Sequence, residues 1–241
     1  MALLAWLTGG AARADEGEPL VADLSNHLVA ITTGFAGATV LLFGAVEGEG
    51  DVVVVVRGPA DPEVVRRKER VLGIWINRAW AEITDLPAFY RVAATRPLDQ
   101  IATPAVLDRH QIGAERLGMQ VHRKDKSVED GEYRAAVLRL KRDAGLYPDK
   151  LGAVTFVGGR LFRTEMEFPA NVPTGTYTVE VYLLRNGEVV SAQTTPLIVG
   201  KTGLGAEVFD FAQRYAPLYG LIAILLAASA GWLAAVAFRR A

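Results

Sequence analysis

The sequence predicts a mainly β protein: an immunoglobulin-like β-sandwich with a small helical insertion, plus one C-terminal transmembrane helix. Three observations predict it. Residues 162–168 and 177–183 alternate apolar and polar side chains with the period of two that strands show. Residues 52–56 are five consecutive valines, which suit a strand that is covered on both faces. Residues 216–238 are uncharged and long enough to cross a bilayer as a helix.

The composition bounds the class of function. The chain has 241 residues, enough for one or two small domains and an anchor. Its net charge of −1 argues against a nucleic-acid partner, which normally requires a basic excess. It contains no cysteine, which excludes disulfides, thiol catalysis and thiolate metal sites. Its histidines, His27, His110 and His122, show no ligand spacing, so we expect no metal and no cofactor.

The first half of the chain reads as strands joined by turns. Strands are expected at residues 26–32, 39–46, 52–56, 74–76 and 89–93. Glycines at Gly34 and Gly37 indicate a turn between the first two of these strands.

A helical insertion is predicted at about residues 97–146. Pro97 and Pro104 each suit a first helical position, and Thr103 is a suitable N-cap for the second helix, which Gly113 would end. Ser127 would cap a longer helix. Its apolar positions fall at helical spacing: Tyr133, Ala136, Val137, Leu140 and Ala144. Gly145 is the expected stop signal.

Strands return after residue 151. Phe162, Thr164, Met166 and Phe168 alternate with charged residues, so Glu165 and Glu167 are expected on a solvated face. Asn186-Gly187 predicts a two-residue hairpin turn before a strand at 189–199. This unit is typical of the end of an immunoglobulin-like sandwich, with two sheets contributed by residues 20–95 and 150–200. Two separate small β domains are the alternative.

The C-terminal end predicts the topology. Tyr215, Tyr219 and Trp232 lie toward the ends of the apolar stretch, where amphipathic rings favour the membrane interface. Arg239 and Arg240 follow at once, and positive charge is retained in the cytoplasm. We therefore expect a cytoplasmic tail at 239–241, an amphipathic lead-in at 203–215, and a periplasmic domain at 15–202 held at the inner membrane.

The N-terminal end is interpreted as a remnant signal peptide spanning residues 1–14. Residues 2–7 form a short apolar run, and Ala12-Arg13-Ala14 fits the small-x-small cleavage rule. The mature chain would then begin at Asp15.

The segment 57–80 is the candidate surface for an anion or a partner. Its residues of interest are Arg66, Arg67, Lys68, Arg70, Trp75, Asn77 and Arg78. Guanidinium groups bind sulfo- and phospho-oxygens through paired hydrogen bonds. The structural alternative is a solvated loop and strand edge, since most charge runs are solvated. No nucleophile and base can be paired anywhere in the chain, so we expect no catalytic residues and no enzyme.

A second candidate surface lies on the apolar stretch. Small residues recur every fourth position at Ala223, Ala227, Gly231 and Ala235, which would let another helix approach closely. Because alanine is abundant throughout this chain, chance spacing is the alternative.

Four stretches carry a family resemblance. They are DLSNHLVAITTGFAGATVLLFGAVEGEGDVVVVVRGP, VVRRKERVLGIWINRAW, FYRVAATRPL and FPANVPTGTYTVEVYLLRNG. From about Asp23 to Phe238 the chain resembles the uncharacterised "putative transmembrane protein" family of alphaproteobacteria. No established activity of that family can be carried over. Its genes often stand beside a permease of the sulfite-exporter type, which implies an accessory role in anion export.

The functional expectation is therefore a non-enzymatic periplasmic accessory protein that associates with an inner-membrane permease. A membrane-tethered module that binds a small anion or an envelope polymer is the alternative. A hydrolase is the third hypothesis.

Overall fold

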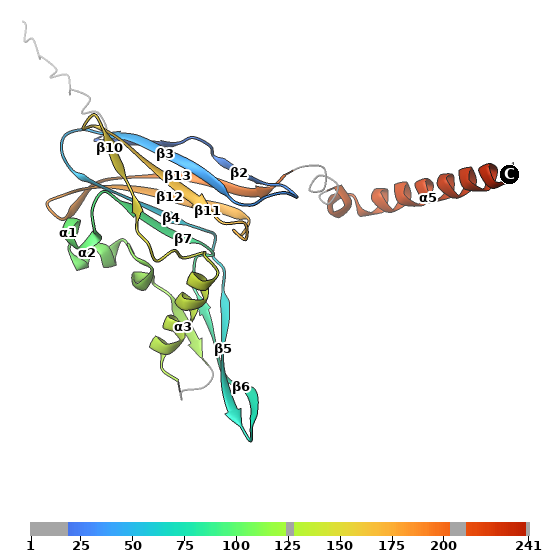
Figure 1. The fold of residues 1–241 in the computed structure, drawn as a ribbon, viewed down its shortest axis with the longest axis horizontal. Coiled ribbons are helices and arrows are strands. Elements are labelled where there is room, and N and C mark those ends of the chain that lie inside the picture. The colour runs from blue at the N-terminus through green and yellow to red at the C-terminus, as the bar shows by residue number, and fades with distance from the viewer. Residues whose placement is uncertain (1–18, 124–127, 203–210, 240–241) are drawn as a thin grey trace, which may run out of the picture.

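The computed structural model describes residues 19–123, 128–202 and 211–239. Figure 1 shows two sheets stacked face to face, with helices and a long β-hairpin on one side and a separate C-terminal helix. The prediction of a mainly β protein with one C-terminal apolar helix is confirmed. The expected signal peptide and the start at Asp15 lie outside the described residues.

The elements are as follows. The strands are β1 (Leu20–Leu24), β2 (Leu28–Ile31), β3 (Ala38–Val46), β4 (Asp51–Arg57), β5 (Glu63–Val71), β6 (Ile74–Thr84), β7 (Tyr90–Ala94), β8 (Gln120–Arg123), β9 (Gly152–Ala153), β10 (Thr155–Val157), β11 (Leu161–Phe168), β12 (Gly175–Arg185) and β13 (Glu188–Lys201). The helices are α1 (Leu98–Ile101), α2 (Pro104–Arg109), α3 (Asp130–Asp143), α5 (Ala216–Phe238) and a 3₁₀ turn, η1 (Ala114–Arg116).

The two sheets of the sandwich each combine strands from both ends of the domain. One has the order β1-β3-β11-β10 and the other β2-β13-β12-β4-β7-β9. The immunoglobulin-like class stays a prediction, and the strand order favours it. When β2 and the strands between β4 and β10 are set aside, the first sheet reads first-second-fifth-fourth and the second reads seventh-sixth-third. A constant-type immunoglobulin domain has this order.

The valine run is a strand covered on both faces, as predicted, and it is an interior strand of the larger sheet. Val52–Val56 lie in β4 between β12 and β7, and each is at most 1% exposed. One side of this sheet faces the other sheet, and the helical insertion lies below it in Figure 1. The run is apolar on both pleat faces because both faces are covered.

The helical insertion partly matches its prediction. Thr103 Oγ1 accepts a hydrogen bond from Val106 N at 3.4 Å, so it caps α2 as expected. Pro97, however, is an N-cap and not a first helical residue. Helix α2 ends at Arg109, not at Gly113, because Gln111 already has a φ of +49°. The predicted cap Ser127 lies outside the described residues.

The three-stranded sheet β5-β6-β8 forms an arm beside the sandwich. Its long hairpin turns at Leu72-Gly73, which have φ values of +50° and +84° and suit a two-residue turn. Figure 1 shows the hairpin projecting away from both sheets. Only the short stretch 74–76 of this hairpin was predicted as a strand.

The arm leaves the sandwich at the end that leads to the C-terminal helix. Strands β4 and β13 are both antiparallel to β12, so they run in the same direction. Arg57, where β4 ends, lies opposite Thr178, which in turn lies opposite Pro196 of β13. The chain therefore enters the arm near the place where β13 approaches its last residue, Lys201.

Candidate functional site

One face of the arm is covered by helix α3. Val65 and Ala79 are buried there. Arg67 Nη1 lies 3.2 Å from Glu132 Oε2 of α3. At the base of the arm, the amino group of Lys141 is 3.0 Å from Asp61 Oδ2 and 2.8 Å from Glu63 Oε1, and Lys141 is 4% exposed. These contacts give the covered face a structural role.

The opposite face of the arm is open to solvent and pairs three cations with two tryptophans and one asparagine. Directly paired residues of an antiparallel hairpin lie on the same face. The pairs here are Arg66 with Trp80, Lys68 with Asn77, and Arg70 with Trp75. All six residues are exposed. We call these six residues the Arg–Trp face.

A β-bulge creates this face. Trp75 and Trp80 are five positions apart, so a regular strand would point them to opposite faces. The register shifts between Arg67 and Lys68, which face Ala79 and Asn77, and leaves Arg78 as the extra residue. The shift returns Trp75 to the same face as Trp80.

The structure brings together five of the seven residues predicted for this surface. They are Arg66, Lys68, Arg70, Trp75 and Asn77. Arg67 does not belong to it, because strand alternation turns it toward α3. Arg78 occupies the bulge, and its side chain lies outside the described part of the structure. Trp80 belongs to the face, although the prediction placed it only in the surrounding segment.

The tip of the arm is apolar, which the prediction missed. Val71 is 38% exposed, Leu72 98%, Ile74 68%, Trp75 64% and Ile76 42%. Large apolar side chains gathered on an exposed tip are a common sign of an interaction site. The signal in the sequence is the run VLGIWI at 71–76, which joins two apolar strand ends across a turn glycine.

The C-terminal helix carries the other predicted surface. Ala223, Ala227, Gly231 and Ala235 follow one another at every fourth position of α5 and are exposed. The stretch Ala216–Val236 is long and apolar enough to cross a membrane, and none of it is buried against the rest of the described chain.

A family model described as "Putative transmembrane protein" matches residues 19–240. The chain belongs to this family. The match includes both the β domain and α5, which fits a membrane-anchored protein, and α5 holds the one candidate span found among the described residues. Searches of curated proteins and of solved structures found no match.

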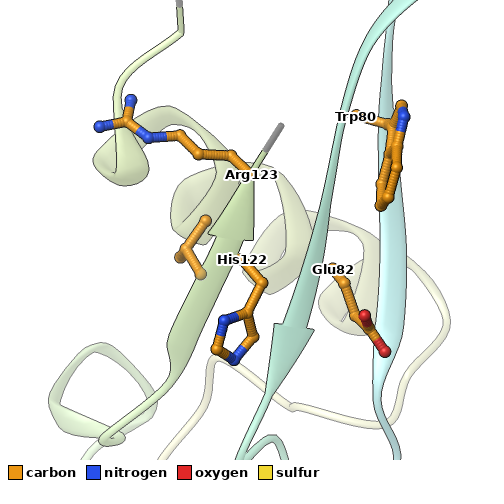
Figure 2. A pocket seen from close by; sticks show the side chains of 5 residues that line it. Trp80, Glu82, His122 and Arg123 are labelled. Carbon is orange, nitrogen blue, oxygen red and sulfur yellow. The ribbon is translucent and has the colours of Figure 1, made fainter. Parts of the chain in front are cut away.

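In this family member, a hollow of about 440 Å³ lies beside the Arg–Trp face. It is lined by Trp80, Glu82, Val121, His122 and Arg123 (Figure 2). Two of these side chains have partners, since His122 Nε2 is 3.0 Å from Thr84 Oγ1 and Arg123 Nε is 2.9 Å from Asp130 Oδ1. The carboxylate of Glu82 marks the end of the basic stretch on this face.

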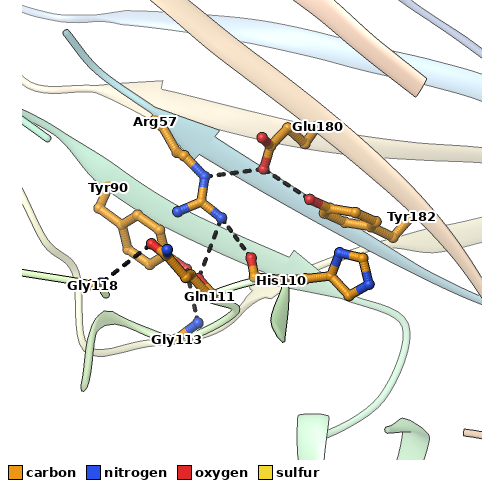
Figure 3. A network of polar contacts seen from close by, with 8 residues as sticks. All are labelled: Arg57, Tyr90, His110, Gln111, Gly113, Gly118, Glu180 and Tyr182. Atoms are coloured by element: carbon orange, nitrogen blue, oxygen red, sulfur yellow. Dashed lines mark hydrogen bonds and ion pairs between the residues drawn. The ribbon is translucent and has the colours of Figure 1, made fainter. Parts of the chain in front are cut away.

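A second polar cluster joins the larger sheet to the helical insertion (Figure 3). Arg57 Nε donates to Glu180 Oε2 at 3.0 Å, and its Nη2 donates to the carbonyl of His110 at 2.8 Å. Tyr90 donates to the carbonyl of Gln111 at 2.8 Å. Tyr182 donates to Glu180 Oε2 at 3.0 Å.

The phenols of this cluster serve as hydrogen-bond donors. Burial raises the pKa of Tyr90 to about 12. Burial, followed by the Glu180 carboxylate, raises the pKa of Tyr182 to about 12. Both phenols therefore stay protonated at neutral pH and act as hydrogen-bond donors. The cluster holds the loop after α2 against the sheet.

Among the residues that the structure describes, no group of three or more potential ligands is placed to hold a metal ion. The three histidines are engaged separately. His27 lies 3.2 Å from Asp23, the His110 ring is tilted against the ring of Tyr182, and His122 contacts Thr84.

Proposed function

We propose that this protein is a non-enzymatic accessory protein of an inner-membrane permease of the sulfite or organic-anion export type. Its β domain lies in the periplasm, α5 holds it in the membrane, and its C-terminus is cytoplasmic. The observation that carries the proposal is a β domain tied to a membrane helix whose side of small residues is exposed along its length. Such a side suits close packing against a second membrane helix.

The charge around α5 supports the orientation. Arg239 and Arg240 follow the helix directly, and Arg214 precedes it. Lys and Arg are retained on the cytoplasmic side, so two cations against one favour a cytoplasmic C-terminus.

The ion pairs formed by buried charged side chains support a non-enzymatic role. Lys141 lies between two carboxylates, and Arg57 is paired with Glu180 and with backbone carbonyls. These pairs fix the insertion and the arm on the sandwich. Groups held in this way are poorly placed to exchange protons with a substrate.

The small-residue side of α5 supports contact with a membrane partner. Helices in lipid associate by close packing, which small residues permit. We propose a permease as this partner because the family resemblance implies that the gene stands beside one for a permease of the sulfite-exporter type.

Co-purification tests the proposal. The intact protein, expressed at its native level and extracted in mild detergent, should bring down a permease that mass spectrometry identifies. Ala227→Leu should abolish this association by blocking close approach. Ser229→Leu, on the opposite side of the helix, should preserve it. Repeated recovery of this protein without a permease would refute the proposal.

A membrane-tethered binding module for a small anion or an envelope polymer is the second candidate. The observation that favours it is the row of Arg66, Lys68 and Arg70 on one exposed face. Calorimetric titration of the full-length protein with sulfate would decide. Binding heat that Arg66→Gln removes and Arg67→Gln retains would favour the module.

A further inference from the structure

We propose that the β5–β6 arm is a second membrane contact of this protein. Its apolar tip enters the interface of the bilayer that α5 crosses, and its Arg–Trp face lies against anionic lipid headgroups. The inference rests on membrane anchoring and does not depend on a permease partner.

The position of the arm makes this contact possible. The chain enters the arm near the end of the sandwich from which β13 leads to α5. From Thr202 to Phe211 there are nine positions, which span at most about 30 Å when fully extended. Strand β5 has nine residues and is therefore about 30 Å long. A tether of this length lets the sandwich lie close to the bilayer, where an arm of about 30 Å can reach the membrane surface.

The tip has the composition of an element immersed in lipid. Val71 is paired with Ile74 on one face, Trp75 lies on the other, and Leu72 stands at the turn. The tip is therefore apolar on both faces and at its end. A flat protein partner would cover only one of these sides, whereas the membrane interface surrounds an inserted tip. Interfacial elements bury apolar side chains in this way to a depth of roughly 5–10 Å.

The charges behind the tip match an anionic surface. Arg70 lies opposite Trp75, and Lys68 and Arg66 follow at successive positions on the same face. Tryptophan favours the boundary between headgroups and acyl chains, and cations favour anionic headgroups just outside it. The order of apolar tip, first indole and cations follows the layers of a bilayer interface, and Trp80 lies farther from the tip, beside Arg66.

Quenching of a label at the tip tests the inference in the full-length protein. Because the chain has no cysteine, Leu72→Cys can carry a single bimane label at a fully exposed position. The labelled protein is reconstituted into phosphatidylcholine vesicles with and without phosphatidylglycerol, each containing lipids that carry a nitroxide quencher. The matched control is Glu188→Cys, an exposed position at the start of β13, at the opposite end of that strand from the anchor.

The expected result is lipid quenching at position 72 and none at position 188. Quenching at 72 should be stronger with phosphatidylglycerol. Each Lys or Arg near an anionic surface favours binding by about fivefold, so Arg66→Gln should lower the ratio of bound to free tip by about that factor. Arg67→Gln removes the same charge from the covered face, where Glu132 offsets it, and should change the ratio little.

Three results would overturn the inference. The first is a lack of quenching of the tip label in phosphatidylglycerol vesicles. If the label is shielded from solvent in native membranes but is not quenched in these vesicles, a protein and not lipid covers the tip. The second is an extent of quenching that is the same with and without phosphatidylglycerol and is unchanged by Arg66→Gln. The third is release of the tip by inorganic phosphate beyond the effect of chloride at equal ionic strength, which would assign the face to a soluble anion.

Discussion

At the scale of single residues, strand register decides which side chains of the arm face helix α3 and which face solvent. Arg67 and Arg66 are neighbours in the sequence with the same chemistry, yet one pairs with Glu132 on α3 and the other faces solvent beside Trp80. Residue type alone could not separate them, because the face of a strand residue depends on register. Alternation was readable only where the side chains differ, as in Phe162 to Phe168, whose buried and exposed positions follow the prediction.

Asp51 gives a pH dependence at the residue scale. Hydrogen bonding to Arg96 and Thr95 holds the pKa of this carboxyl below its usual 3.8, against the effect of burial. A lowered pKa in the folded state stabilises the fold above the unfolded pKa, and this contribution is lost as the pH falls through the folded value. Asp51→Asn should therefore unfold with a weaker dependence on pH below about 4. Acid titrations of both proteins by circular dichroism in detergent measure this, and identical acid profiles would contradict it.

Elements with strong local signals were predicted well from the sequence. A local sequence pattern predicts each of the valine strand β4, the Asn186-Gly187 turn and the apolar helix α5. Strands β5 and β8 are among those that were missed. The charge run Arg66 to Arg70 hides the alternation of β5, and β8 has four residues that are strand only because they pair with β6.

The bulge in β6 supports a prediction at the element scale. Arg78 is the extra residue, and its neighbours Asn77 and Ala79 already face consecutive residues of β5. Deleting Arg78 should close the strand into a regular register without moving any pair, so the Arg–Trp face should persist. The tip label at position 72 should then be quenched by phosphatidylglycerol vesicles as in the parent protein. Loss of quenching with the fold retained would show that the bulge itself, or the Arg78 charge, is needed.

At the scale of the whole molecule, a β domain is held to a membrane by the helix that follows its last strand and, as we propose, by its arm. The sequence predicted the anchor and the mainly β class because both depend on local patterns. It could not predict that the arm leaves the sandwich near the end that leads to the anchor. That juxtaposition depends on the pairing of β4 with β12, which joins residues more than a hundred positions apart, together with the β12–β13 hairpin.

The central claim is that the β domain and its arm lie outside the cytoplasm, and cysteine labelling tests it most directly. In the native cysteine-free background, Ser191→Cys on β13 and Ala241→Cys at the C-terminus are treated with a membrane-impermeant maleimide in intact spheroplasts. We expect position 191 to react at once and position 241 to react only after the membrane is permeabilised. Reaction at 241 together with protection at 191 would place the domain in the cytoplasm and contradict the account.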